Sequence, residues 1–210
     1  MHLHVFQDSM GNENFNMAAF NRAIDDANNF FSPICFSFGI CEIDTIKNYN
    51  FNKLNLPNEL DPLYANYTIG NRLNIFIIDS LVVNGDPNPC GLGGGNRVTL
   101  QRNCYGALTH ELGHVFGLQH TFEGTELVDG SDCDVEGDTI CDTPADPYTE
   151  DPFITWIIDC EFVFEGTDAN GQLYQPDVGN IMSYYGCDCG FTRGQYLRMV
   201  ETYLFKSKMW

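Results

Sequence analysis

Basic residues are scarce in this 210-residue sequence: 10 Lys and Arg stand against 29 Asp and Glu, for a net charge of −19. Nucleic acids and anionic membrane surfaces would repel such a chain, so we exclude both as partners. Long apolar runs are also missing, since none approaches the roughly 18 residues of a membrane-spanning helix. The acidity is compatible with calcium binding, with solubility outside the cell and with basic peptide substrates, but a well-solvated surface explains it equally well.

Several recurrent signals are absent too. The sequence has no internal repeat, no low-complexity tract and no C-x-x-C pair of the kind that builds a zinc ribbon. The opening residues 1–15 have neither a basic segment nor a long apolar one, so we do not expect a signal peptide there. An exported protein would therefore have lost its targeting segment, and no pro-segment is evident.

Cysteine is plentiful, with nine residues at positions 35, 41, 90, 104, 133, 141, 160, 187 and 189. This frequency without ribbon spacing favours disulfides and an oxidising compartment, so we expect a secreted or extracellular protein. The odd number leaves at least one thiol unpaired or paired outside this chain. Cys35 with Cys41, and Cys90 with Cys104, are candidate pairs.

The pattern of apolar residues predicts a folded domain with helices and strands, because 43% hydrophobic and 13% aromatic residues suffice for a core. The predicted strands are 2–6, 34–40, 73–79 (central in a sheet) and 97–100. The predicted helices are 15–31, 104–119 and 192–205. Residues 48–71 and 121–179 are expected to be loop-rich. The glycines at 91–95 indicate a flexible turn leading into an edge strand; a phosphate loop is the weaker alternative, because no G-K-[ST] follows.

Histidine is rare, and three of the five lie in the string H-E-x-x-H-x-x-G-x-x-H. Residues four apart share one helix face, so His110 and His114 can offer their imidazoles to one ion. Gly117 lets the backbone leave the helix, and the turn returns His120 as a third ligand. Three protein ligands leave one tetrahedral position open for water, as in a catalytic zinc site. Glu111 is placed to activate that zinc-bound water as general base and to protonate the leaving amine.

The remaining two histidines, His2 and His4, lie near the start of the chain. We interpret them as strand residues near a frayed end rather than as ligands.

The zinc string resembles the extended signature of the metzincin metalloproteases, which implies a later methionine turn beneath the metal. The segment 180–184, N-I-M-S-Y, resembles that turn, with Met182 as its base; alone, the same residue would be ordinary core. Tyr184 resembles the tyrosine that stabilises the oxyanion in several metzincins; a packed aromatic is the alternative.

Three further strings resemble the pappalysin family within the metzincins: H-T-F at 120–122, G-D-T-I-C-D-T-P-A-D at 137–146 and F-T-R-G-Q at 191–195. The likeness is dense from about residue 73 onward and thin before it. It implies an α+β fold: one catalytic domain over 1–210, with an upper lobe to about 117 and a lower lobe from about 118. A twisted mixed sheet with a backing helix and the active-site helix would form the upper lobe. The irregular lower lobe would carry disulfides and end in a helix.

The resemblance also implies calcium in the acidic segment, where Asp138 and Thr143 are the candidate ligands. An acidic turn with hydrogen-bonded caps is the competing interpretation. Pappalysins tend to cut before basic residues, and Asp188 occupies the place of an acidic group in that pocket. The flanking C-D-C sequence at 187–189 differs from the family's pattern.

These observations lead to a secreted zinc endopeptidase acting on proteins or peptides. We favour a monomer, with Zn²⁺ and a candidate Ca²⁺ as cofactors. Two alternatives stay open: a catalytically silent metal-binding or adhesion module on the same fold, and a metal hydrolase acting on a non-peptide substrate.

Overall fold

The computed structural model describes residues 1–56, 58–83 and 89–206. Two compact units make up the chain: Met1–Phe116 together with the residues from Tyr203 onward, and Gly117–Thr202. Each is described by itself. Among the described residues, no helix combines the length and apolar character needed to cross a membrane.

The first unit is built on a five-stranded mixed sheet of order β2-β1-β4-β7-β6. Its strands are β1 (His2–Phe6), β2 (Glu42–Ile46), β4 (Asn74–Ile78), β6 (Gly91–Gly94) and β7 (Arg97–Gln101). All neighbours are parallel except the β6–β7 pair, which is antiparallel. The predicted strands 2–6 and 73–79 are confirmed, and β4 is the middle strand, as its continuous apolar run indicates.

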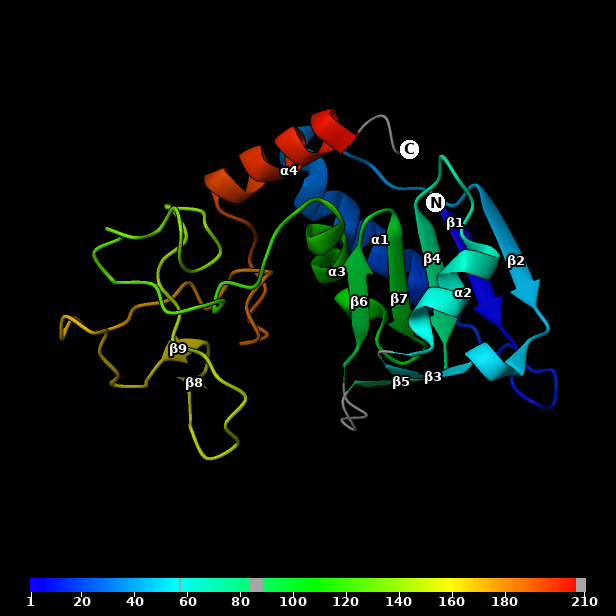
Figure 1. The fold of residues 1–210 in the computed structure, drawn as a ribbon, viewed down its shortest axis with the longest axis horizontal. Helices are drawn as coiled ribbons and strands as arrows, with labels where there is room; N and C mark the ends of the chain where they lie inside the picture. Colours follow the sequence, from blue (N-terminus) through cyan, green and yellow to red (C-terminus); the bar gives the residue numbers. More distant parts are fainter. Residues whose placement is uncertain (57, 84–88, 207–210) are drawn as a thin grey trace. The chain divides into compact units, whose positions relative to one another are not determined.

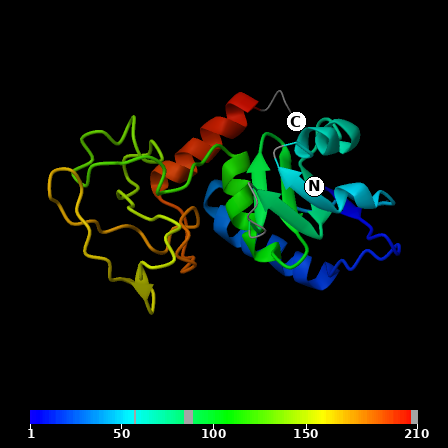
Figure 2. The same ribbon diagram turned by 60° about the horizontal axis from the view of Figure 1, so that its bottom comes forward.

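Helices cover both faces of this sheet (Figures 1 and 2). On one face, Phe6 and Phe76 pack with Leu63 of α2 (Leu60–Tyr67). That side also carries a small parallel sheet of β3 (Lys53–Leu56) and β5 (Ser80–Val83). On the other face lies α1 (Met17–Phe31), which contacts α3 (Leu108–Val115), and α3 in turn contacts β6 and β7.

The backing helix α1 follows from its sequence. Asn16 caps it, since its Oδ1 accepts a hydrogen bond from the Ala19 N–H at 3.0 Å. Its buried residues are spaced three and four apart, which makes one apolar face: Phe20, Ala23, Ile24, Ala27 and Phe31. The predicted helix is confirmed with a start two residues later, and it is followed by a 3₁₀ turn (Ser32–Ile34) that contains Pro33.

The predicted strand at 34–40 is wrong: these residues form no strand, and the pairing segment is β2 at Glu42–Ile46. The alternating aromatics there pack elsewhere, with the Phe38 ring 5.1 Å from that of Phe31. The Asn28 side chain takes the place of a strand neighbour. Its Oδ1 accepts the Phe38 N–H at 2.6 Å, and its Nδ2 donates to the Phe38 carbonyl at 3.1 Å.

The predicted loop at 48–71 is also wrong, because it contains a 3₁₀ turn (Tyr49–Phe51), β3 and α2. Leu54 and Leu63 are fully buried in this segment. Short elements held by a few apolar anchors carry too little periodicity to stand out among Asn, Pro and Tyr.

The glycine-rich segment is the edge strand itself rather than a turn leading into one. Gly91–Gly94 forms β6, the turn lies at residues 95–96, and the predicted strand at 97–100 is the internal strand β7. A Cβ on Gly93 would overlap the carbonyl oxygen of Glu111 in α3. Glycine is therefore required here by the close approach of the helix.

The predicted helix at 104–119 is shorter than expected. A 3₁₀ turn (Tyr105–Ala107) precedes α3, which ends at Val115. Cys104 is tied to Cys90 by a disulfide ahead of the helix, and Gly117 has a φ of 86°, which ends the helical path.

The second unit has little regular structure, as predicted for residues 121–179. It contains the short hairpin β8 (Ile157–Ile158) and β9 (Glu161–Phe162) and most of α4 (Arg193–Lys206), the confirmed final helix. Disulfides Cys133–Cys141 and Cys160–Cys187 tie its loops.

One disulfide expectation fails. Cys90–Cys104 forms as anticipated, but Cys35 and Cys41 are both free and exposed, as is Cys189. The architecture is otherwise the predicted α+β class: a twisted mixed sheet with a backing helix and the motif helix, then an irregular part that ends in a helix.

Candidate metal centre

Helix α3 presents two imidazoles side by side. His110 and His114 are one helical turn apart, and their Nε2 atoms lie 3.2 Å from each other. Zinc–nitrogen bonds of about 2.0–2.1 Å in a tetrahedral site require nitrogens about 3.4 Å apart. The spacing of this pair therefore fits one shared zinc-sized cation.

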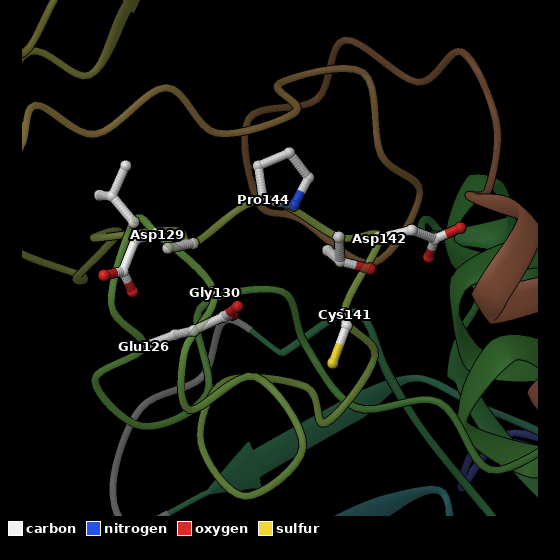
Figure 3. A pocket seen from close by; sticks show the side chains of 9 residues that line it. Glu126, Asp129, Gly130, Cys141, Asp142 and Pro144 are labelled. Carbon is white, nitrogen blue, oxygen red and sulfur yellow. The ribbon is translucent and has the colours of Figure 1, made fainter.

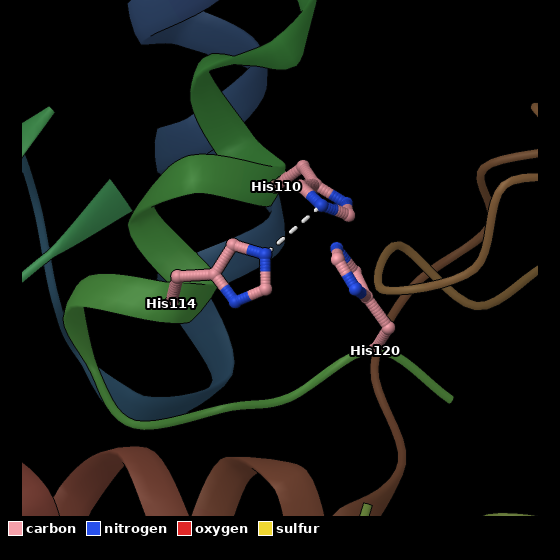
Figure 4. A group of neighbouring side chains, drawn as sticks. All are labelled: His110, His114 and His120. Atoms are coloured by element: carbon pink, nitrogen blue, oxygen red, sulfur yellow. Dashed lines mark hydrogen bonds between the residues drawn. The ribbon is translucent and has the colours of Figure 1, made fainter. Parts of the chain in front are cut away.

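A third imidazole follows along the same segment. The positive φ of Gly117 turns the chain out of the helix, and a Cβ there would lie 2.5 Å from Thr202 Oγ1. His120, six residues after His114, carries this imidazole (Figure 4). His110, His114 and His120 each offer one ligand atom that could hold a metal ion. The donor set is three nitrogens, which suits a borderline divalent ion such as Zn²⁺.

Glu111 is buried against β6 and only 5% exposed. A Cβ on Gly91 would lie 2.9 Å from its Oε1, so the bare strand makes room for the carboxyl group. Burial raises the pKa of Glu111 to about 8, against a lowering by the Gly93 backbone N–H. A divalent cation held by the neighbouring histidines would favour the carboxylate instead.

The predicted methionine turn lies beside the residue that follows His120. Met182 is fully buried, and its carbonyl accepts the Thr121 N–H at 3.3 Å. Asn180 shapes the turn, because its Oδ1 accepts the Met182 N–H at 2.9 Å. The Tyr184 ring stands edge-on to the His120 ring, with centroids 4.8 Å apart, and remains 45% exposed.

Comparison with known proteins identifies the family. Residues 95–203, more than half of the chain, match the sequence profile of the M43 peptidases, described as pregnancy-associated plasma protein-A. The chain belongs to the M43 peptidase family, the pappalysins. The matched region holds every residue of the three-histidine string, the methionine turn and the two downstream strings. Membership in a family of metallopeptidases implies a metal.

A curated relative agrees with this assignment. An extracellular metalloprotease of Colletotrichum graminicola is 33% identical over 139 residues, which is 65% of this chain. The aligned part is 42% of that relative, so the chain spans less than half of its length.

The two downstream strings of this M43 chain contact each other within the second unit. Asp142 of the first string accepts hydrogen bonds from Thr192 Oγ1 at 2.8 Å and from the Gly194 N–H at 2.7 Å. Thr192 and Gln195 form a capping box: the Gln195 N–H donates to Thr192 Oγ1 at 3.2 Å, and the Thr192 N–H donates to Gln195 Oε1 at 2.9 Å. The first string therefore caps the helix that the second one begins.

Sequence reasoning missed a buried network behind the third histidine. Asp146 accepts hydrogen bonds from Thr121 Oγ1 and from Tyr185 Oη, both at 2.6 Å, and from the Tyr148 N–H at 3.0 Å. Thr121 follows His120 directly, so this carboxylate anchors the backbone that carries the imidazole. Asp146 is the last residue of the string at 137–146 that resembles the pappalysins, so the sequence marks it as a candidate functional residue. The sequence does not show which residues it contacts.

The candidate calcium residues are both buried: Asp138 is 1% and Thr143 is 2% exposed. Burial raises the pKa of Asp138 to about 6, against hydrogen bonds from Thr143, the Ile140 N–H and Gln195 that lower it. Thr143 and Glu126 line an open pocket of about 200 Å³ (Figure 3). Burial, then the charges of Asp138 and Asp132, raise the pKa of Glu126 to about 7. Sequence reasoning missed Glu126 as a member of this acidic group.

Asp188 lies on an exposed stretch after the methionine turn rather than in a buried pocket. Desolvation still raises the pKa of its carboxyl above the usual value.

Proposed function

We propose that this M43 chain is a zinc-dependent endopeptidase, with His110, His114 and His120 as zinc ligands and Glu111 as the general base. One observation carries the proposal: the buried Glu111 carboxyl lies on the same helix as two imidazoles spaced for a tetrahedral cation. Zinc bound there would polarise the scissile carbonyl and acidify a water molecule at its open position.

The residues of the chain supply the proton transfers. Glu111 takes a proton from the attacking water and returns it to the leaving amine. The Gly93 N–H holds this carboxyl against β6. Tyr184, exposed beside His120, donates its phenolic hydrogen bond to the developing oxyanion.

Substrate binding would use β6, the antiparallel edge strand beside Glu111. Its outer edge pairs with no other described strand, so an extended peptide can add to the sheet there. We propose proteins or peptides as substrates, a basic residue after the scissile bond selected by Asp188, and secretion of the enzyme. The whole chain would act as one catalytic domain of two lobes.

Replacing the base tests the mechanism. We expect Glu111→Gln to lower kcat by about 10²–10⁴-fold or more while zinc content stays unchanged, because the proton acceptor is lost but the ligands remain. Cleavage of a fluorogenic peptide and metal analysis of the same sample measure both quantities. The exposed Glu150→Gln serves as control. Unimpaired peptide cleavage by Glu111→Gln would contradict the proposed mechanism. A wild-type protein that cleaves no peptide, with or without a chelator, would favour the catalytically silent metal-binding or adhesion module.

Tyr184→Phe separates oxyanion stabilisation from packing. We expect kcat to fall by about 10-fold or more with little change in KM, since the ring stays and only the hydroxyl donor goes. Steady-state kinetics on one peptide suffice. An unchanged kcat would assign Tyr184 a packing role beside His120.

Calcium binding by Asp138 and Thr143, with Glu126 nearby, is the second proposal for this chain. We expect added Ca²⁺ to raise the Tm of the wild-type protein, because binding to the folded state alone stabilises it. The Asp138→Asn variant should lose that increase. A Ca²⁺-dependent shift that survives the substitution would contradict these ligands.

A further inference from the structure

The two histidines outside the zinc string lie together in the core of the first unit. His2 and His4 are alternate residues of β1, so they share one face, and their ring centroids lie 4.5 Å apart. Asp44, paired with His4 in the edge strand β2, lies on the same face. One ligand atom from each of these three residues lies within 4.8 Å of the others. They are not a frayed end, because His2 is 4% and His4 is 1% exposed.

Asn74 determines which nitrogen of His4 carries the proton. The Asn74 Nδ2 donates to the Ile69 carbonyl at 3.0 Å and to the Arg72 carbonyl at 2.9 Å, so its amide orientation is fixed. Its Oδ1 is therefore an acceptor, and His4 Nε2, at 3.0 Å, must be the donor.

The other nitrogen, His4 Nδ1, then holds a free lone pair. It is buried and has no hydrogen-bond partner among the described residues. A buried acceptor without a partner is unfavourable, because it has lost its hydrogen bonds to water. A neutral imidazole whose other nitrogen donates to a protein carbonyl is also the usual state of a metal-ligating histidine.

Two carboxylates of the exposed strand β2 lie close to the His2 ring. Asp44 Oδ2 lies 2.8 Å from His2 Nε2, and Glu42 Oε2 lies 3.6 Å from His2 Nδ1. The Asp44 side chain is 49% exposed and can therefore shift. Around a tetrahedral zinc ion, the ligand atoms of His2, His4 and Asp44 would have to lie about 3.4 Å from one another, and a shift of the Asp44 side chain would shorten its distances to the two rings.

We propose that His2, His4 and Asp44 form a second metal site, for Zn²⁺ or a similar borderline divalent ion. Two imidazoles with a carboxylate suit that class of ion, and Glu42 supplies further negative charge. Bound metal satisfies the His4 Nδ1 lone pair and links β1 to the edge strand β2. The site is separate from the three-histidine segment and independent of peptidase activity.

Zinc stoichiometry tests the second site. The untagged full chain is loaded with Zn²⁺, dialysed and measured by mass spectrometry. We expect about two zinc ions per wild-type chain and about one in Asp44→Ala, because the second site loses one of its three ligands. Asp26→Ala, which removes an exposed carboxylate from α1, should keep both ions. Peptidase activity should be equal in all three proteins.

The outcomes separate this site from the proposed function. If the three-histidine segment bound no zinc, the wild-type chain would hold one ion, and Asp44→Ala would hold none. That result would contradict the proposed function but support the second site. Equal zinc content in wild type and Asp44→Ala would overturn the second site. As a second measurement, Zn²⁺ should raise the urea midpoint more in the wild type than in Asp44→Ala; equal shifts would also overturn it. Circular dichroism verifies that the exposed substitution leaves the fold intact.

Discussion

Gly93 occupies a position where any side chain would overlap the backbone of Glu111. We expect Gly93→Ala to lower the free energy of unfolding by about 1–3 kcal/mol, because the added methyl forces strand and helix apart. Peptidase activity should fall with it, since the displaced residue is the proposed base. Urea unfolding and kcat/KM measure the two effects.

The neighbouring Gly94 is the matched control. A Cβ there meets nothing within 4 Å, and its backbone does not have a positive φ. Gly94→Ala should therefore leave stability and activity nearly unchanged. Equal losses in the two variants would show that the strand needs flexibility rather than clearance.

Asp146 gives a pH dependence of stability. Burial raises its pKa above the ordinary 3.8, against hydrogen bonds from Thr121, Tyr185 and Tyr148 that lower it. The folded protein therefore holds this proton more tightly than the unfolded chain. The stability from this group is fully present below its unfolded pKa and is lost as pH rises through its folded pKa.

The neutral variant Asp146→Asn removes this titration. We expect the unfolding free energy of the wild type, relative to the variant, to decrease as the pH rises from about 4 toward neutrality. Urea unfolding of both proteins across that range measures the difference. A difference that grows with pH would contradict the raised pKa.

Among the elements, α4 depends on a residue far from it in the sequence. The Asp142 carboxylate accepts hydrogen bonds from Thr192 Oγ1 and the Gly194 N–H at the helix start, where a negative charge also complements the helix dipole. We expect Asp142→Ala to cost about 0.5–2 kcal/mol of unfolding free energy. The exposed Asp134→Ala is the control, and chemical denaturation is the measurement. Equal stability of the two variants would show that the capping box suffices without Asp142.

Elements with a strong local signal were predictable, and those held by distant side chains were not. The apolar run of β4 and the stripe of α1 determine their own structure. Residues 34–40 alternate like a strand, but Asn28, a residue of α1, satisfies the Phe38 backbone instead. The glycines of β6 signal close packing, yet only the structure shows that α3 is what approaches them.

The candidate site divides in the same way. The three histidines and Glu111 form one contiguous string, so helical spacing alone predicts their grouping. The contacts of Asp146 with Thr121 and Tyr185 join positions 25 and 39 residues away, and no spacing rule connects them. The sequence shows His4 only as a residue of a strand. That its buried Nδ1 has no hydrogen-bond partner follows from the orientation of the Asn74 amide, which only the structure gives.

At the scale of the whole molecule, the second unit has little regular structure, and two disulfides connect its loops. Cys160–Cys187 closes a separation of 27 residues and Cys133–Cys141 one of 8. From the loop-closure entropy, we expect the free energy of unfolding to fall by about 3.5 kcal/mol when Cys160 and Cys187 are replaced by serines, and by about 2.5 kcal/mol when Cys133 and Cys141 are replaced. Thermal unfolding of the two double variants should show that order. The double variant of the free thiols Cys35 and Cys41 should unfold like the wild type; destabilisation there would indicate a bond in solution.

The exposed thiols also make the protein easy to label. Cys41 and Cys189 belong to different units and react without disturbing a disulfide, once Cys35 is replaced by serine. A donor dye on one and an acceptor on the other would report the separation of the units in single molecules. Such a pair could record whether an inhibitory peptide or a chelator changes that separation.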